Sequence, residues 1–513
     1  MKQLLAIACA GVIVSYFMTM LVRWAARKSG FVDRPDGHHK YHEGDVALGG
    51  GLAVFLSVIV TLAGAFFFLP EIRQYISPTM GSLALAGAWM VMLGLYDDRY
   101  GMPGKYKLLG QILGVLILIT SGLVIPEFVA FGWRVKLGVL AIPFTMFWLL
   151  GAINSLNLLD GIDGLASTIG IILCIAIATM ATTVSNPIRM DVALIAAAVA
   201  AGLIGFLKYN FPPASMFLGD AGSMLIGLVV GTLSIEGAMK GTATVAMAAP
   251  IALWALPMFD SMAAIVRRKM TGRSIYATDR GHLHHRLMNK FGTNTRVLAV
   301  VAVCCAVTCI GALLSMLMHS DLLALAGVGI VVCILILTQA FGHVEFLMLA
   351  SRAKSLSYNL LKPVRQNSAR SEAFRLQGTR EWNLLWQSVT EFAEKMQLVE
   401  ARLDINLAAV QEGYHATWRR PTDTERREQW RTELPLISGG HAVGKLTVIG
   451  ERKEGSTYCE TIERLAEMLE PLEAEIIQLL ESHKQEALHP EEPALEETNG
   501  EGHALAKTAA ESV

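Results

Sequence analysis

Long apolar runs alternate with short polar segments over the first two thirds of the chain. The runs are about 17–22 residues long, which is the length of a helix that crosses a hydrocarbon core about 30 Å thick. We predict eleven such helices, at about residues 3–22, 48–69, 80–96, 108–124, 137–153, 164–184, 191–209, 219–236, 243–263, 297–318 and 321–341. The pattern indicates an all-α polytopic membrane protein with its two termini on opposite faces of the membrane.

The composition agrees with this interpretation and excludes some classes of site. Of 513 residues, 53% are hydrophobic and 17% are charged, and the mean hydropathy is +0.45. Six of the seven cysteines lie in apolar runs without a CxxC or Cys/His spacing, so neither a disulfide framework nor a zinc site is indicated. The first apolar run continues to Val22 and is followed by "RWAARK", which indicates an uncleaved span and not a signal peptide.

The pattern changes after the membrane domain, which we place at residues 1–345. Residues 346–380 are charged and irregular and are interpreted as a linker. Residues 381–482 have the pattern of a small soluble α/β domain. Residues 483–513 are rich in Glu and Ala, and such a segment cannot form a core, so we expect a disordered acidic tail.

Within the soluble domain, turn residues separate one helix pattern from several strand patterns. We predict a helix over 381–396, and a final amphipathic helix over 457–482. Between them we predict four strands, at 401–410, 413–420, 431–438 and 441–450. The domain contains no catalytic constellation, and a sensor or docking role with a partner of unknown identity stays open.

Basic residues are distributed unevenly between the predicted loops. Loops after odd-numbered spans hold seventeen Lys and Arg residues, whereas the other loops and the N-terminus hold six. Because loops rich in Lys and Arg stay in the cytoplasm, we place the odd loops and the C-terminus there. The polar, motif-like segments fall in the same odd loops, so they predict one cytoplasm-facing site assembled from several loops.

Five aspartates stand at the ends of these predicted spans. Asp97 and Asp98 are adjacent, point about 100° apart on a helix, and repel each other unless a cation or proton lies between them. Asp160 and Asp163 are three positions apart and share a face if the segment is helical. Asp220 begins a span, where a carboxylate beside glycines suits a Mg²⁺ ion shared with phosphate. The alternative is that Asp160, Asp163 and Asp220 cap helices. For Asp97 and Asp98 the alternative is a solvated helix end paired with Arg99.

A histidine-rich segment follows the ninth predicted span. His282, His284 and His285 occupy three of four positions, and Arg280 and Arg286 flank them. The spacing does not match an HExxH metal site and no cysteine accompanies it. We therefore interpret the segment as an anion-binding loop.

The first odd loop is also basic and is followed by glycines. It contains His38, His39, Lys40 and His42, and residues 49–51 are glycines. This set would hold phosphate through side chains and backbone amides, or would only touch anionic lipid. Acidic groups, glycines and basic groups on one membrane face suit phosphoryl transfer, and the location indicates that one substrate is a lipid.

Five motifs together resemble a known family. They are "DRPDGHHKYH…LGG", "GLYDDR…KLLGQ", "NSLNLLDGIDGLA", "NFPPASMFLGDAGS" and "DRGHLHHRL", and in this order they are similar to the polyprenyl-phosphate N-acetylhexosamine-1-phosphate transferases, of glycosyltransferase family 4 type. The resemblance covers about residues 1–345. The "HLHHRL" form resembles the branch that uses UDP-N-acetylglucosamine, and the branch that uses UDP-muramoyl-pentapeptide is the alternative. Val46 and His39 depart from the usual Pro and Arg of the first motif.

The resemblance implies an enzyme of the bacterial inner membrane, of a family that is often homodimeric, with a cytoplasmic active site. It implies transfer of a sugar-1-phosphate from a UDP-sugar to undecaprenyl phosphate, with Mg²⁺ or alternatively Mn²⁺, release of UMP, and initiation of a cell-envelope polysaccharide. Asp220 matches the metal ligand of the family. The resemblance implies catalytic roles for Asp97, Asp98, Asp160 and His284, and substrate contacts for Asn157, Asp163, Asn210, Phe217, His282, His285, Arg286, Lys40 and His42.

Alternatives remain for the mechanism and for the function. We expect direct attack of the lipid phosphate on the β-phosphorus, with Asp97 removing its proton, and the rival is a two-step route through a carboxyl-phosphate intermediate. A secondary transporter also has many spans, but it would have acids in mid-span and repeated halves. Here the acids lie at span ends and no such repeat is visible.

Overall fold

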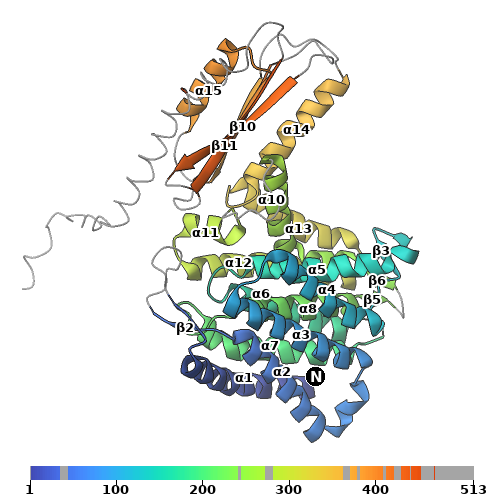
Figure 1. The fold of residues 1–513 in the computed structure, drawn as a ribbon. Coiled ribbons are helices and arrows are strands. Elements are labelled where there is room, and N and C mark those ends of the chain that lie inside the picture. Colours follow the sequence, from blue (N-terminus) through green and yellow to red (C-terminus); the bar gives the residue numbers. More distant parts are fainter. Residues whose placement is uncertain are drawn as a thin grey trace, which may run out of the picture. The chain divides into compact units, whose positions relative to one another are not determined.

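The computed structural model describes most of the chain (Figure 1). The described residues are 2–34, 44–185, 187–240, 244–271, 281–361, 370–377, 382–407, 412–420, 429–438, 441–451 and 467. They form two compact units, Met1–Asn359 and Leu360–Val513. The first unit is helical, and the second contains a sheet.

The first unit follows the apolar runs of the sequence closely. Its helices are α1 (Lys2–Ser29), α2 (Gly50–Phe68), α3 (Pro78–Tyr100), α4 (Gly104–Thr120), α5 (Ala141–Leu159), α6 (Leu165–Thr183), α7 (Met190–Asn210), α8 (Gly219–Gly237), α9 (Ala248–Leu253), α10 (Ala255–Thr271), α11 (Leu283–Phe291), α12 (Asn294–Leu317), α13 (Asp321–Leu337) and α14 (His343–Leu361). Short 3₁₀ turns lie at Pro70–Tyr75 and Gly138–Leu140.

Among the described residues, eight helices are long and apolar enough to cross a membrane, which makes the chain a multi-pass membrane protein. The predicted count of eleven is not confirmed. Helices α4 and α13 have 17 residues each, and the predicted span at 243–263 is divided between α9 and α10. Pro257 explains the division, because its ring would clash with the carbonyl of Leu253 in a continuous helix and it has no N–H to donate.

Helix α8 lies at the centre of the first unit. It is buried along nearly its whole length, whereas α1 and α2 expose most of theirs. Small residues allow the close packing, since a Cβ added to Gly227 of α8 would lie 2.6 Å from the Cα of Ile153 in α5. The central position matters because α8 begins at Asp220, one of the predicted site residues.

The two ends of the helix bundle carry different short strands. Strands β1 (Val32–Asp33) and β2 (Val46–Ala47) pair antiparallel before α2. A second sheet, in the order β4-β3-β6-β5, contains β3 (Glu127–Ala130), β4 (Trp133–Lys136), β5 (Met239–Lys240) and β6 (Thr244–Ala246). In Figure 1, β2 lies at one end of the bundle and β3, β5 and β6 at the other. This separation matches the predicted division between odd and even loops.

An ionic cluster ties the helices together at the end where α8 finishes. Arg189 donates to the carboxylates of Asp191 (Nη2 to Oδ2, 2.9 Å) and Glu236 (Nη2 to Oε2, 2.5 Å). Thr79 of α3 donates to the other oxygen of Glu236 at 3.0 Å. The cluster lies about 24 Å from Asp220 along α8, from the rise of about 1.5 Å per residue, so it stabilises the bundle without touching the predicted site.

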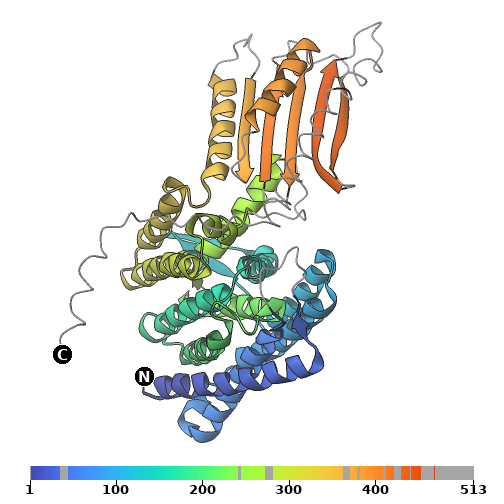
Figure 2. The same cartoon turned by 90° about the vertical axis from the view of Figure 1, so that its left-hand side faces the viewer.

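The second unit is a five-stranded antiparallel sheet with a helix on one face (Figure 2). The strand order is β10-β11-β8-β9-β7, with β7 (Arg370–Gln377), β8 (Glu400–Leu407), β9 (Glu412–Arg419), β10 (Gln429–Ser438) and β11 (His441–Glu451). Helix α15 (Asn383–Lys395) packs Trp386 and Val389 against Leu403 and Trp418 of the sheet. The predicted helix over 381–396 and the four predicted strands are confirmed.

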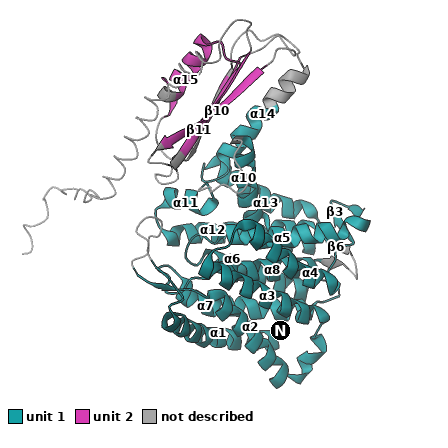
Figure 3. Ribbon diagram, in the orientation of Figure 1, with its two compact units in different colours: residues 1–359 teal, residues 360–513 magenta. Residues whose placement is uncertain are grey.

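The interpretation of 346–380 as an irregular linker does not hold for its described residues. Most of α14 and all of β7 lie there, and β7 pairs with β9 at the edge of the sheet. Figure 3 distinguishes the two units by colour. An edge strand is held by backbone hydrogen bonds, so it forms without the apolar alternation on which the prediction relied. The predicted helix over 457–482, apart from Glu467, and the tail over 483–513 lie outside the described residues.

Candidate active site

A polar pocket of about 370 Å³ lies at the end of the bundle where α3, α5 and α7 finish and α8 begins. Segments far apart in the sequence contribute to it, as the sequence analysis predicted. Its lining residues are Leu48, Asp98, Asp160, Gly161, Ile162, Asp163, Asn210, Phe217, Leu218, Gly219 and Asp220. Six of the predicted site residues therefore share one pocket.

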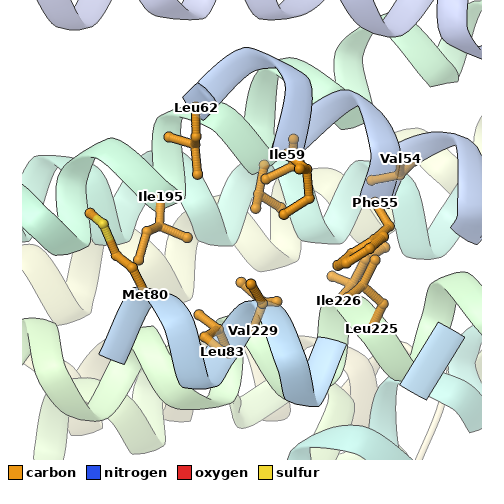
Figure 4. Close-up of a pocket in the computed structure, with 13 residues that line it drawn as sticks. Val54, Phe55, Ile59, Leu62, Met80, Leu83, Ile195, Leu225, Ile226 and Val229 are labelled. Carbon is orange, nitrogen blue, oxygen red and sulfur yellow. The ribbon is translucent and has the colours of Figure 1, made fainter. Parts of the chain in front are cut away.

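A second pocket, of about 60 Å³, has a different character (Figure 4). It lies among α2, α3, α7 and α8, and only apolar side chains line it, including Phe55, Met80, Ile195 and Leu225. Because no titratable or hydrogen-bonding side chain lines it, it offers no chemistry. The polar pocket is the candidate active site.

Asp98 holds the start of α8. Its Oδ1 accepts the N–H of Asp220 at 2.8 Å and its Oδ2 accepts the N–H of Ala221 at 3.4 Å. Gly219 has φ 72° and a Cβ there would lie 2.5 Å from Asp98 Oδ2, so only glycine allows this approach. Asp98 thus caps α8 and fixes the backbone of Asp220, and it is not the solvated helix end of the alternative interpretation.

Lys107 of α4 joins Asp97 to Asp220. Its Nζ lies 2.9 Å from Asp97 Oδ2 and 2.8 Å from Asp220 Oδ2. Asp97 Oδ1 accepts the N–H of Met102 at 2.6 Å, so both of its oxygens are engaged and it does not line the pocket. The sequence analysis counted Lys107 only as a loop cation. Its position in the quoted "KLLGQ" motif was the signal that could have found it.

Asn157 completes the surroundings of Asp220. Its Nδ2 donates to Asp220 Oδ1 and to Ser223 Oγ, at 2.5 and 2.9 Å. With Lys107 on Oδ2 and Asn157 on Oδ1, the Asp220 carboxylate is held in one orientation. Asn157 therefore acts on Asp220 and is not itself among the residues that line the pocket.

Asp160 and Asp163 follow the last turn of α5, where the helix opens towards the pocket. Asp163 Oδ2 accepts the N–H of Ala214 at 2.9 Å, which joins the α5–α6 loop to the loop before α8. Burial, and then the nearby carboxylates of Asp220, Asp98 and Asp163, raise the pKa of Asp160 well above its usual range. A cation in the pocket would relieve this crowding of negative charge.

Asn210 is buried at the end of α7, and its side chain is engaged within the protein. Its Oδ1 accepts from Ser167 Oγ at 2.9 Å and its Nδ2 donates to the Met216 carbonyl at 3.1 Å. These bonds fix the segment that carries Phe217 into the pocket. Asn210 thus lines the pocket, and its side-chain hydrogen bonds also fix the shape of the pocket wall.

The glycines at the start of α2 serve a structural purpose. The N–H groups of Gly50 and Gly51 donate to the carbonyls of Phe217 and Leu218 at 3.1 and 3.0 Å. A Cβ on Gly51 would lie 2.2 Å from the backbone nitrogen of Gly222, so the two segments are in direct contact. These two amides are therefore not phosphate donors, contrary to one of the two interpretations of this loop. The basic residues of that loop, Lys40 and His42 among them, lie outside the described residues.

The histidine segment packs against the pocket through His284. A Cβ on Gly161 would lie 2.1 Å from His284 Nε2, so the imidazole rests on the backbone of a pocket-lining residue. Burial, and then the charges of His285 and His282, lower the pKa of His284 well below its usual 6.5, so its ring is neutral at pH 7. The His285 ring lies 4.2 Å from that of His284.

Asp260 of α10 orients the start of this segment and was not found by the sequence analysis. Its Oδ2 lies 2.9 Å from His282 Nδ1 and its Oδ1 accepts the N–H of Leu283 at 2.7 Å. Asp260 lies inside an apolar run with no polar neighbour pattern, so the sequence offered little signal for it. Arg286, one turn later, lies 3.7 Å from Glu345 of α14.

The donor set of the pocket fits a divalent cation of the Mg²⁺ type. Among the described residues, no three His, Cys, Asp or Glu side chains form a ready-made metal cluster. Mg²⁺ does not need one, because it commonly uses one or two carboxylates and takes its other ligands from phosphate and water. Asp220, fixed by Asp98 and Asn157 and facing the pocket, is the carboxylate best placed to serve it.

Comparison with known proteins places the chain in a family. Residues 80–238 match the model of glycosyl transferase family 4. The "probable undecaprenyl-phosphate N-acetylglucosaminyl 1-phosphate transferase" of Bacillus subtilis is 34% identical over 287 residues, which are 55% of this chain and 76% of that protein. The chain belongs to glycosyl transferase family 4.

Other members of glycosyl transferase family 4 are similar over comparable lengths. The decaprenyl-phosphate N-acetylglucosaminephosphotransferase of Mycobacterium tuberculosis is 32% identical over 338 residues, 61% of this chain and 82% of that protein. The undecaprenyl-phosphate alpha-N-acetylglucosaminyl 1-phosphate transferase of Escherichia coli K12 is 27% identical over 314 residues, 59% and 82%. The family segment at 80–238 contains the five aspartates that the sequence analysis singled out, but it does not contain the histidine segment. These aspartates are Asp97, Asp98, Asp160, Asp163 and Asp220.

Proposed function

We propose that the protein transfers N-acetylglucosamine-1-phosphate from UDP-N-acetylglucosamine to undecaprenyl phosphate and releases UMP. The observation that carries the proposal is the gathering of Asp98, Asp160, Asp163 and Asp220 in one pocket at the ends of membrane-length helices. The names of the relatives support both the donor and the lipid acceptor. The product would begin a cell-envelope polysaccharide.

In the proposed reaction an oxygen of the lipid phosphate attacks the β-phosphorus of the UDP-sugar. The bond from that phosphorus to the oxygen of UMP breaks, and UMP leaves with the electron pair. Positioning and charge neutralisation supply most of the catalysis in phosphoryl transfer. Phe217, at the pocket wall, would stack on the uracil, and Asp163 and Asn210 would bound the nucleotide side of the pocket.

Asp220 would hold the Mg²⁺ ion, which would neutralise the charge that develops on the leaving diphosphate oxygen. Lys107 now contacts one oxygen of Asp220, and its flexible side chain would turn towards the substrate phosphates. Asp97 would be free to accept a proton from the lipid phosphate after Lys107 has moved, since Lys107 holds its Oδ2. His284, neutral and resting on Gly161, would donate to the diphosphate or the sugar.

We also propose that the pocket faces the cytoplasm of a bacterial cell, at the surface of the inner membrane. The excess of basic residues in the odd loops supports this orientation. Tyr96 and Tyr100 are exposed beside Asp97 at the end of α3, where aromatic side chains commonly mark the membrane interface. The lipid phosphate would then reach the pocket from the level of the head groups.

The test is UMP release by the full-length protein in detergent, with undecaprenyl phosphate, MgCl₂ and a panel of UDP-sugars. Asp220→Asn removes the proposed metal ligand, and Asp191→Asn is the matched control because it removes an acid at the opposite end of the bundle. We expect UMP with UDP-N-acetylglucosamine, its loss with EDTA and in Asp220→Asn, and its retention in Asp191→Asn. Absence of UMP with every donor, from well-folded protein, would exclude the proposed reaction.

A further inference from the structure

Glu345, in the first turn of α14, lies buried between two arginines from other elements. It is 4% exposed, its Oε1 accepts from Arg267 Nη1 of α10, and Arg286 Nη2 of α11 lies 3.7 Å from the same oxygen. One carboxylate from α14 therefore contacts α10, which precedes the histidine segment, and α11, which contains His284 and His285.

Arg267 transmits this contact to the backbone of the histidine segment. A Cβ on Gly281 would lie 2.5 Å from Arg267 Cζ, so the guanidinium packs flat against the residue that precedes His282. Arg267 is 2% exposed. Its planar, fully charged group can leave water only if a carboxylate meets it, and Glu345 is such a carboxylate.

The histidine segment is in turn connected to the pocket. His282 is oriented by Asp260, and two residues later His284 rests on Gly161, beside Asp160. A displacement at Gly281 therefore changes where the His284 ring lies over the pocket. No contact in this series involves residues of the family segment at 80–238 other than Gly161 and Asp160 themselves.

We propose that Glu345 is a positioning residue for catalysis, which holds the histidine segment over the pocket through Arg267 and Arg286. Helix α14 is then part of the catalytic assembly, although it lies more than 100 residues after the family segment and leads into the second unit. The kinetic consequence rests on the proposed function. The structural consequence, the placement of the histidine segment, does not.

The kinetic test compares two buried glutamates that each accept from an arginine. Glu345→Gln keeps the shape and removes the charge. Glu236→Gln does the same in the cluster with Arg189 at the far end of the bundle. It is therefore the control for the loss of a buried ion pair. We expect Glu345→Gln to lower kcat/KM for the UDP-sugar by about 10- to 100-fold. The kcat/KM of Glu236→Gln should stay within about threefold of the wild-type value, because Glu236 does not position any group at the candidate active site.

Combination with His284→Gln separates positioning from general damage. If Glu345 acts through His284, the double variant Glu345→Gln, His284→Gln loses little more activity than His284→Gln alone. For Glu236→Gln combined with His284→Gln, the factors by which the two single variants lower kcat/KM should instead multiply. Equal effects of the two glutamate variants, or full multiplication for Glu345, would overturn the proposal.

Hydrogen exchange gives a result that does not depend on activity. We expect faster exchange of amides in α11, Leu283–Phe291, in Glu345→Gln than in wild type or Glu236→Gln. Unchanged exchange would overturn the proposal even if the wild type is active. Faster exchange with no UMP release from wild type would leave the placement of the segment correct and the proposed function wrong. If Glu345→Gln does not fold, Glu345→Asp keeps the charge, and wild-type kcat/KM and exchange in that variant would overturn the proposal.

Discussion

Replacement of Lys107 by Met should have opposite effects on metal binding and on catalysis. Lys107 is a cation that bridges two carboxylates, with Nζ 2.8 Å from Asp220 Oδ2 and 2.9 Å from Asp97 Oδ2. A metal bound by Asp220 must compete with it. Lys107→Met removes the competitor and leaves the two acids without a counter-charge, while methionine keeps most of the apolar stem.

The size of the effect follows from the distances. At an effective dielectric constant of about 20, a pair of unit charges 2.8 Å apart attracts by about 6 kcal/mol. Desolvation offsets much of this, and removal of one partner from a buried pair costs about 3–5 kcal/mol. We therefore expect an apparent Tm several degrees lower in EDTA, because the Lys107 side chain is only 16% exposed and the acids repel each other without it.

The assay is the apparent Tm of full-length protein in detergent, in EDTA and over a MgCl₂ titration. Freed of Lys107, Asp220 should bind Mg²⁺ at least about tenfold more tightly, which adds about 1.4 kcal/mol of stabilisation at saturating metal. UMP release should nevertheless fall, since the cation that would meet the substrate phosphates is gone. Lys105→Met is the matched control, because Lys105 is exposed and lies over the Tyr106 ring.

A Mg²⁺-dependent rise in Tm that is equal or smaller in Lys107→Met than in wild type would refute this reasoning. It would mean that Lys107 and the metal do not share Asp220. A Tm in EDTA equal to that of wild type would show that the bridge contributes nothing to the metal-free fold.

Three further predictions test other parts of the structure. Gly161→Ala should lower UMP release about 100-fold at nearly unchanged Tm, because its Cβ would lie 2.1 Å from His284 Nε2 and displace that ring. Gly151→Ala is the control, since its Cβ would meet only an atom 3.9 Å away. Equal activity of the two variants would contradict the contact between Gly161 and His284. Since the folded-state pKa of His284 is lowered, the unfolded chain binds more protons below about pH 6.5, so stability should fall as pH decreases below that value. The fall should be smaller in His284→Gln, and an identical fall in apparent Tm between pH 7.5 and 5.5 would argue against a buried neutral ring. Arg189→Met should cost about 3–5 kcal/mol of stability by leaving the buried Glu236 carboxylate without its cation, and KM should not change. A raised KM would show that the far cluster reaches the site.

Much of the architecture was readable from local patterns. Span lengths and the alternation in the second unit report burial directly, because a residue's polarity sets where it is stable. The pocket aspartates were readable for the same reason, since a carboxylate at the end of an apolar run is costly unless it serves a purpose. Asp98, Asp160, Asp163 and Asp220 indeed meet in one pocket.

Two features differ from the sequence-based expectation, and their physical reasons differ. The ninth predicted span is divided before Pro257, and α4 and α13 have 17 residues each, so the count of eleven is not confirmed. Strand β7 has no apolar alternation and forms because β9 offers it a backbone ladder. The division of the ninth span has a local cause, since the ring of Pro257 would meet the carbonyl four residues before it. Strand β7 instead depends on a partner strand more than 30 residues later in the chain.

The sequence by itself thus determined the helical membrane class, the end of the bundle at which the candidate active site lies, and the acids that line its pocket. Only the tertiary structure decided what each polar group does there. Asp98 caps α8, Gly51 donates its amide to a neighbouring loop, Lys107 holds Asp220, and Glu345 holds the arginines beside the histidine segment. These roles depend on distances of a few ångströms between residues that are tens to hundreds of positions apart, and no local pattern encodes them.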